Sequence, residues 1–408
     1  MSSSSQPLTS TNRIEYSYVE ESELGVTPAS PNFQALPVTG ASLDGNISTE
    51  QSQTIRTDRQ TDDLITVDSE IGGDLNFEVT YAPYKPLLTA LMQNNTSFTF
   101  SDVDTDVSAT WDNNARTLTL SSVNVNFSTL SAGRFVRVDG FTNAGNNGIF
   151  RVISVPDADT LVLRVPPSAK LTPATEGAGN SVTVDVTSSV RNGNDVPKCY
   201  TFQKSIGGLP TNAIFYYRGV QVAGANFTFS VGSILTAVMN LMGLTEQATD
   251  TAIAGQTVAA IPAYKIMNSV SSLSKVDVVK ADGTAVGTRY ENLTLNIGNN
   301  IQAAKQLGTL GAAGLASFTV DVSGEVRLYF QDITVYQSFA NSEAFAISLV
   351  VEDASGNAIA LSLPYVKFEN LDKPVEGRDS FFFTNGTFRG LREPTENYTV
   401  QIDFFDAP

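Results

Sequence analysis

The chain has 408 residues, 41% of them hydrophobic, and this length is enough for two or three separate cores. It contains no histidine, the commonest general base and transition-metal ligand, so most hydrolase and metalloenzyme functions are excluded. The 42 acidic residues against 25 basic ones give a net charge of −17, which repels phosphate backbones and argues against tight nucleic-acid binding.

The start of the chain indicates synthesis and folding in a cytoplasm. The first residues, MSSSSQ, lack the basic segment and apolar core of a signal peptide. The single cysteine, Cys199, excludes internal disulfides. No segment approaches the roughly 18 apolar residues needed to span a bilayer, so we expect a soluble protein without a membrane partner.

Most of the chain predicts β-strands. Residues 74–81 alternate strictly between polar and apolar side chains, which predicts a half-buried antiparallel strand. The best helix candidates are residues 83–92, where a proline stands near the start, and residues 234–242. Residues 343–364 predict a hairpin whose second strand ends at Pro364, because proline cannot donate to a β-ladder.

One part of the sequence recurs faintly later in the chain. The two copies are residues 36–91 and residues 286–339. Leu43 lies 30 positions before Gly73, and Leu295 lies 29 positions before Gly324, so both glycines keep nearly the same distance from a leading strand. This self-similarity predicts an internal duplication.

About a hundred residues of the first copy have no counterpart in the second, which is the size of a small independent domain. Residues 148–153 and 160–165 predict paired strands within it, and such short strands separated by turns suggest a sandwich or barrel. We therefore expect an all-β fold with two sandwich- or barrel-type domains in tandem, an inserted small β domain and few short helices. The expected domains are residues 1–94 with 198–243, residues 95–197, and residues 244–408.

The acidic segments do not predict a catalytic or metal site. Residues 102–106 start like a calcium loop, but Val107 stands where such a loop needs glycine, and Asn113 stands where it needs a bidentate carboxylate. The acidic run between residues 58 and 78 could supply a carboxylate pair, although several of its members simply occupy the polar phase of an alternating strand. With no nucleophile elbow, Cys/His pair or dinucleotide fingerprint, the sequence predicts a structural protein, not an enzyme, with no catalytic residue, metal or cofactor.

Five segments of the chain match a known family in order and spacing. They are YVEESELGVTPASP (residues 18–31), TIRTDRQTD (54–62), GGDLNFEVTYAPY (72–84), VSGEVRLYF (322–330) and SLPYVKF (362–368). Through them the chain resembles the major tail tube proteins of long-tailed, siphovirus-type bacteriophages. The resemblance covers most of the chain outside residues 95–197, and that insertion resembles the outward-facing decoration domains of some tail tubes.

The resemblance implies a virion tail protein, assembled in the host cytoplasm, that polymerises into stacked rings around a channel for the genome. Its implied partners are further copies of itself, a tape-measure protein, and tail terminator and distal tail proteins, while genomic DNA passes without tight binding. Because family rings are commonly sixfold and this chain holds two tube folds, we expect a trimer with pseudo-sixfold symmetry rather than a hexamer. The candidate residues lining an acidic lumen, chosen from the polar phase of strands, are Asp68, Glu70, Asp74, Glu78 and Glu325.

Other placements and functions follow from the same sequence. The polar arm of residues 1–12 and a long connection over residues 244–282 are the expected ring-to-ring contacts, and the insertion is expected outside the tube. The alternatives are a single-ring tail connector or distal tail protein with the same fold, or a virion carbohydrate- or receptor-binding module in which residues 95–197 recognise the ligand. A polysaccharide-degrading enzyme built on carboxylate pairs is a more distant alternative.

Overall fold

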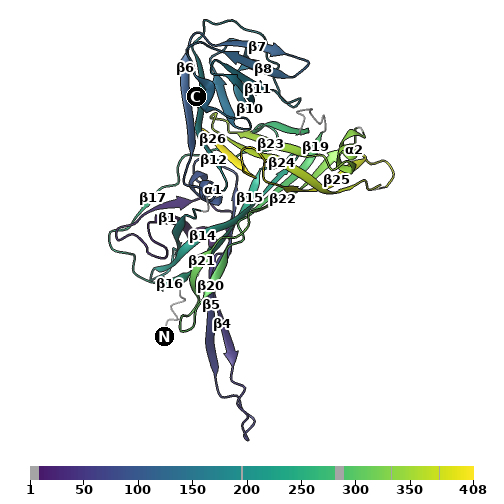
Figure 1. Ribbon diagram of the computed structural model, residues 1–408. Helices are drawn as coiled ribbons and strands as arrows, with labels where there is room; N and C mark the ends of the chain where they lie inside the picture. Colours follow the sequence, from purple (N-terminus) through teal and green to yellow (C-terminus); the bar gives the residue numbers. More distant parts are fainter. Residues whose placement is uncertain (1–8, 194–195, 281–288, 332, 376) are drawn as a thin grey trace.

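The computed structural model describes residues 9–193, 196–280, 289–331, 333–375 and 377–408, and these form an almost entirely β structure (Figure 1). The predicted all-β fold with few short helices is confirmed. The helices of the described part are α1 (Lys85–Leu91) and α2 (Thr334–Ala340), with single 3-10 turns at Thr11–Arg13, Phe127–Thr129 and Ala144–Asn146.

The strands fall into three groups along the chain. The first group is β1 (Ile14–Glu21), β2 (Asn32–Leu36), β3 (Gly40–Ala41), β4 (Asp44–Gln51), β5 (Leu64–Glu78), β13 (Cys199–Ile206), β14 (Ala213–Ser230), β15 (Thr236–Gly243), β16 (Thr245–Thr249) and β17 (Thr257–Ala259). The insertion contains β6 (Phe98–Asp104), β7 (Ser108–Asp112), β8 (Thr117–Ser121), β9 (Phe135–Asp139), β10 (Gly148–Asp157), β11 (Thr160–Arg164) and β12 (Val182–Arg191). The last group is β18 (Leu273–Lys280), β19 (Tyr290–Gly298), β20 (Gln302–Lys305), β21 (Ala312–Ala316), β22 (Asp321–Tyr329), β23 (Phe345–Glu352), β24 (Ala358–Asp372), β25 (Phe383–Gly390) and β26 (Gln401–Phe405).

One antiparallel sheet, which we call the inner sheet, runs through both repeats. Its strands are hydrogen-bonded in the order β4-β5-β15-β14-β19-β22-β25-β24. The first four strands lie within residues 44–243 and the last four within residues 290–390, and the pair β14–β19 joins the two sets. We call these sets, each together with the outer strands that pack on it, the first and the second repeat. In both sets the second strand, β5 or β22, is followed by a short helix, α1 or α2.

The two glycines of the sequence repeat occupy matching places in these sets. Gly324 pairs with Leu295, and a Cβ on Gly324 would overlap the carbonyl oxygen of Thr294. A Cβ on Gly73, which has a φ of +143°, would overlap the carbonyl oxygen of Ser42. In each repeat, glycine therefore allows the leading strand to approach the second strand closely.

Outer sheets cover the apolar face of the inner sheet. The first repeat has the order β16-β14-β13-β1-β2-β17, and the second has the order β18-β23-β24-β26-β12. The long strands β14 and β24 belong to both layers, because the first half of each pairs in the outer sheet and the second half in the inner sheet. One hydrophobic core fills the space between the layers and continues through both repeats.

The insertion packs on the outer sheet of the second repeat. Its strands follow the order β6-β12-β9-β10-β11-β8-β7 around a second hydrophobic core, and the predicted pairing of residues 148–153 with 160–165 is present as β10–β11. That core also includes Val350, Ala358, Ala360 and Phe405 from the second repeat. Figure 1 shows the insertion beside β23 and β26, away from the long hairpin of β4 and β5.

Three sequence predictions about local structure are wrong. Residues 236–242 of the helix predicted at 234–242 belong to strand β15, because the strand is hydrogen-bonded on both sides, to β5 and β14, and Ala237, Met239 and Leu241 alternate into the core. Strand β24 does not end at Pro364 but passes through it, at the point where the pairing with β23 shifts register and no ladder bond is required of the proline. Residues 244–282 are not one long connection, since they contain β16, β17 and β18. The contact arm predicted at residues 1–12 lies largely outside the described residues, so this prediction is not tested.

Candidate functional site

The face of the inner sheet that points away from the core is polar across both repeats. One row of directly paired residues crosses six strands, and its members are Glu78, Thr236, Thr228, Thr294, Glu325 and Thr387. None of these six side chains is buried. The neighbouring row on the opposite face is Phe77, Ala237, Phe227, Leu295, Gly324 and Phe388, in which the apolar side chains are all buried. The period-two alternation of each strand thus adds up to one continuous polar surface, which we call the polar face.

Two further rows extend the polar face along the strands. The first is Asn76, Val238, Asn226, Asn296, Ser323 and Arg389, and the second is Asp74, Asn240, Gly224, Gly298 and Asp321. Asn240 donates a 2.7 Å hydrogen bond from Nδ2 to Oδ1 of Asp74, so an amide orients this carboxylate within its row. Uncharged hydroxyl and amide groups therefore separate the carboxylates of the two repeats.

The structure separates the five predicted lumen residues into two places. Asp74, Glu78 and Glu325 lie on the polar face, and Glu78 and Glu325 share one row. Asp68 and Glu70 lie further down β5, where this strand leaves the sheet and pairs only with β4 in the described part of the chain. Lys305 of β20 forms ion pairs with both of them, at 2.7 Å to Glu70, and its ammonium group lowers the pKa of the Asp68 carboxyl.

Sequence reasoning missed three charged residues of this surface. Asp321 belongs to the same alternation as Glu325 and could have been found from it. Arg389 and Arg327 place positive charge on the polar face, but each guanidinium group lies beside a carboxylate. Arg389 forms ion pairs of 2.8 Å with Asp321 and 2.6 Å with Glu369, and Arg327 lies 2.6 Å from a carboxylate oxygen of Glu291.

Both outer edges of the inner sheet are open in the described part of the chain. On one side β3 and β4 pair only with β5. On the other side, the segment of β24 after Val366 pairs only with β25. Unpaired strand edges of this kind are templates for pairing with another chain.

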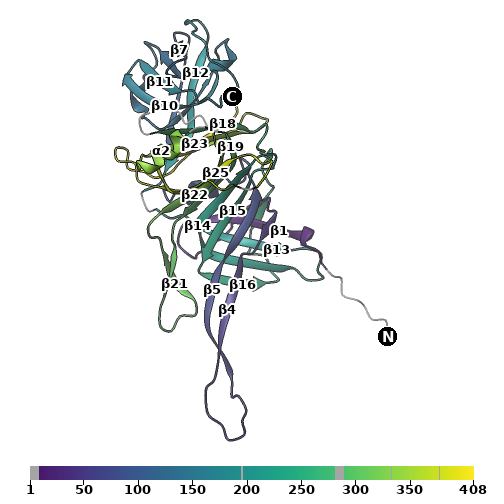
Figure 2. The same cartoon turned by 90° about the vertical axis from the view of Figure 1, so that its right-hand side faces the viewer.

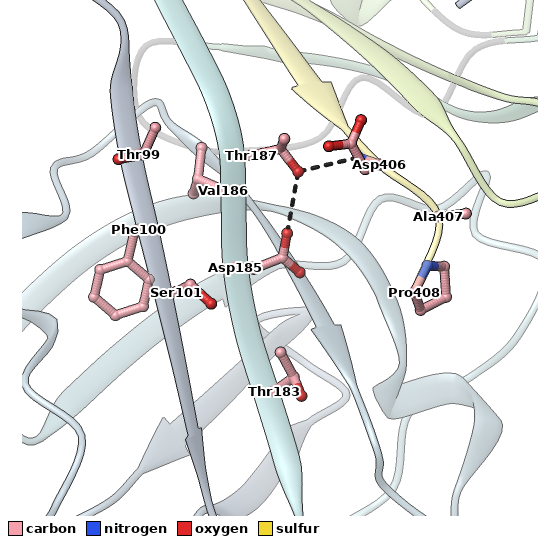
Figure 3. Close-up of a pocket in the computed structure, with 10 residues that line it drawn as sticks. All are labelled: Thr99, Phe100, Ser101, Thr183, Asp185, Val186, Thr187, Asp406, Ala407 and Pro408. Carbon is pink, nitrogen blue, oxygen red and sulfur yellow. Dashed lines mark hydrogen bonds between the residues drawn. The ribbon is translucent and has the colours of Figure 1, made fainter.

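A cavity of about 450 Å³ lies where the insertion meets the C-terminal segment (Figure 3). The main-chain N–H of Asp406 donates a 3.0 Å hydrogen bond to Oγ1 of Thr187, which in turn donates to Asp185 at 3.5 Å. The carboxylate of Asp406 accepts a 2.7 Å hydrogen bond from the hydroxyl of Tyr81, and burial together with this contact raises the tyrosine pKa. Because these polar groups bond to one another across three segments, the geometry describes a structural joint, with no group poised for chemistry.

The segment that starts like a calcium loop is the end of strand β6 and the bend that follows it. The Asp106 carboxylate accepts hydrogen bonds from the hydroxyl of Ser122 and from the main-chain N–H groups of Val123, at 2.7 Å, and Asn124, at 3.1 Å. Among the residues that the structure describes, no group of three or more His, Cys, Asp or Glu side chains is arranged to hold a metal ion.

Comparison with known proteins identifies the family. The family model described as phage tail tube protein matches residues 11–388, which is nearly the whole chain. No curated protein matches the chain. No helix in the described ranges is long and apolar enough to cross a membrane. The chain therefore belongs to the phage tail tube protein family, whose members are structural components of the virion tail and not enzymes.

Proposed function

We propose that three copies of this chain close into a ring with pseudo-sixfold symmetry, and that such rings stack into the tail tube of a siphovirus-type phage. The observation that carries the proposal is the strand order of the inner sheet, in which two four-stranded sets follow each other in the same order. The domain limits that fit this division are residues 1–94 with 198–243 for the first tube fold, 95–197 for the insertion and 244–408 for the second tube fold.

Ring closure repeats a contact that already exists within the chain. Inside one subunit, the last strand of the first set, β14, pairs with the first strand of the second set, β19. If the free segment of β24 pairs in the same way with β3 and β4 of the next subunit, each chain supplies two equivalent steps around the ring. Three chains then make six steps and leave no open edge.

The polar face is the surface that we assign to the lumen. It lies on the opposite side of the hydrophobic core from the outer sheets, so closing the inner sheet into a barrel turns it toward the axis. Asp74, Glu78 and Glu325 present carboxylates there, among hydroxyl and amide groups, while Asp68 and Glu70 would line the channel where the β4–β5 hairpin continues it. Carboxylates repel the DNA phosphates, so the genome can slide through without adsorbing.

The insertion belongs on the outside of the tube in this arrangement. It packs on the outer sheet of the second repeat through Val350, Ala358, Ala360 and Phe405, with the whole core between it and the polar face. The outer position leaves residues 95–197 free to contact the host surface or to stiffen the tube. The tape-measure protein, the tail terminator and the distal tail protein are the further partners of this proposal, and assembly takes place in the host cytoplasm.

Electron cryo-microscopy of the purified protein, concentrated at low and then at high salt, tests the proposal. We expect hollow tubes with threefold rings whose lumen is lined by Glu78 and Glu325. Single closed rings that do not stack would instead indicate a tail connector or distal tail protein, and persistent monomers would lead to glycan-binding assays on residues 95–197. A map in which the polar face lies on the outside would contradict the lumen assignment.

A substitution in β24 tests ring closure itself. Glu369 is exposed and stands at a register shift of β24, where it is paired in register with no residue of β25, although its side chain forms the ion pair with Arg389. Glu369→Pro should therefore leave the subunit folded but block the addition of a strand to this edge. We expect monomers from Glu369→Pro and assembled rings from the matched control Glu369→Ala; rings from both variants would contradict closure through β24.

A further inference from the structure

The two ends of the inner sheet are built differently. In the second repeat, Gly298 pairs with Asp321 at the end from which the β20–β21 hairpin leaves, and Tyr290 pairs with Leu328 at the other end. The β4–β5 hairpin leaves the first repeat at the same end as β20–β21, and both point the same way in Figures 1 and 2. The β24–β25 loop lies at the opposite end, because Phe383 pairs with Tyr329.

The hairpin end carries an exposed apolar edge. Beyond Ile71, the last residue of β5 that pairs with β15, the strand continues for seven residues to Leu64, which corresponds to about 23 Å of extended chain past the sheet. The exposed apolar side chains of this hairpin are Ile47, Ile55, Leu64, Ile65 and Val67, and Ile55 at its tip is 99% exposed. The shorter β20–β21 hairpin exposes Leu307 and Leu310.

The opposite end of the second repeat carries an exposed aromatic patch, which we call the aromatic end. Its exposed members are Phe330, Ile333, Tyr336, Val375, Phe381 and Phe382, and Phe381 is 73% exposed. The rings already hold one another in place, since the centroids of Phe330 and Phe382 are 5.1 Å apart and those of Tyr329 and Phe381 are 5.6 Å apart. The main-chain N–H of Phe330 also donates a 3.0 Å hydrogen bond to the carbonyl oxygen of Phe382. Exposed apolar clusters of this kind on a soluble chain mark interaction sites.

We propose that the aromatic end of one chain receives the apolar edge of the β4–β5 hairpin of a second copy in the next ring. The inference rests on the proposed function, because in a stack of identical rings each upper end must fit the lower end of the next ring, which is a heterologous contact. The hairpin is long enough to reach past its own ring. It is the larger of the two hairpins and bears more exposed apolar side chains, so it is the better match for the six-residue patch.

The test is a pair of polar substitutions on the patch. Phe381→Ser with Phe382→Ser changes two exposed side chains and keeps the carbonyl that Phe330 uses, so the subunit should melt as the unmodified protein does. We expect closed rings that fail to stack, with the protein concentration needed for tube growth raised about tenfold or more, measured by sedimentation velocity and negative-stain microscopy. The control Val123→Ser, at an exposed apolar position of the insertion, should form tubes at the ordinary concentration.

A cross-link identifies the occupant of the patch. With the photoreactive amino acid benzoylphenylalanine in place of Phe381, irradiated tubes should yield cross-links to residues 44–71 of another chain. Cross-links to residues 302–316 or to the insertion would overturn the pairing, as would tubes formed by the double serine variant at the ordinary concentration. Either result would contradict the pairing of hairpin and aromatic end while leaving the proposed function intact. If the unmodified protein itself formed neither rings nor tubes, the proposed function and this inference would both be contradicted.

Discussion

Replacement of Asp403 by asparagine should change how stability depends on pH. Asp403 lies in β26, where this strand joins the insertion to the second repeat by pairing with Ser189 of β12 and Ala360 of β24. Its side chain is 0% exposed, and one carboxylate oxygen accepts a 2.6 Å hydrogen bond from Nε2 of Gln401. Burial raises the carboxyl pKa from 3.8 to about 6, because Ser189, Gln401 and the nearby arginines only partly replace the lost hydration.

The sign and size of the effect follow from proton linkage. Between pH 3.8 and pH 6 the folded chain holds a proton on Asp403 that the unfolded chain has released, so folding stability falls as the pH rises through this window. A shift of about two units corresponds to about 3 kcal/mol once the group is fully ionised. The side-chain amide of asparagine cannot ionise, so Asp403→Asn should exceed the unmodified protein in stability by about 1.5 kcal/mol at pH 5 and by about 3 kcal/mol at pH 8.

Guanidinium-induced unfolding at both pH values measures this difference. The control Asp63→Asn removes an exposed carboxylate and should show no such growth of the difference with pH. An equal difference at pH 5 and pH 8 would refute the linkage argument. A variant less stable than the parent at pH 8 would also refute it, since attraction to Arg134 and Arg191 would then outweigh the cost of burial.

Four further substitutions probe other parts of the fold. Gly73→Ala and Gly324→Ala should each destabilise the protein by about 2 kcal/mol or more, because the new Cβ overlaps a carbonyl oxygen, whereas Gly314→Ala, with open space around it, should change thermal unfolding little. Loss of hydration around the ammonium group of the half-buried Lys275 lowers its pKa to about 7. The unfolded chain therefore binds this proton up to a higher pH, and stability should rise by up to about 4 kcal/mol between pH 7 and pH 10, whereas Lys275→Met should lack this rise in the same unfolding assay. Lys305→Ala should leave the melting temperature nearly unchanged, because the ion pair is exposed. The pKa of the Asp68 carboxyl should move up toward its ordinary value, as followed by carboxyl NMR.

Local alternation was enough to predict much of the inner sheet. The strand predicted at residues 74–81 is present as the end of β5, although it stops at Glu78, and helix α1 (Lys85–Leu91) falls within the predicted 83–92. The helix predicted at 234–242 failed because its leucines, methionines and alanines suit either structure, and only the two flanking strands decide that this segment is β15.

The arrangement of the site could not be read from local patterns. That Glu78 and Glu325 share one row depends on the registers of four successive strand pairs, which involve residues far apart in sequence. The same reason explains why Asp68 and Glu70, although in phase with Glu78, lie on a hairpin that leaves the sheet and meets Lys305. Period and composition give the face of a strand but not its neighbours.

The burial pattern along a strand differs between the inner sheet and the outer sheet of the second repeat. Strands of the inner sheet bury one face only, so β15 alternates between buried and more accessible residues along its length. In the outer sheet of the second repeat, every residue of β26 and all but the last of β23 are buried, because one face of this sheet meets the core shared by the repeats and the other meets the core of the insertion. A chain without the insertion would expose Val350, Ala358, Ala360 and Phe405 on that face. The continuous apolar run of β23 therefore indicates from the sequence alone that both faces of this sheet are covered, and the packing shows that the insertion covers one of them.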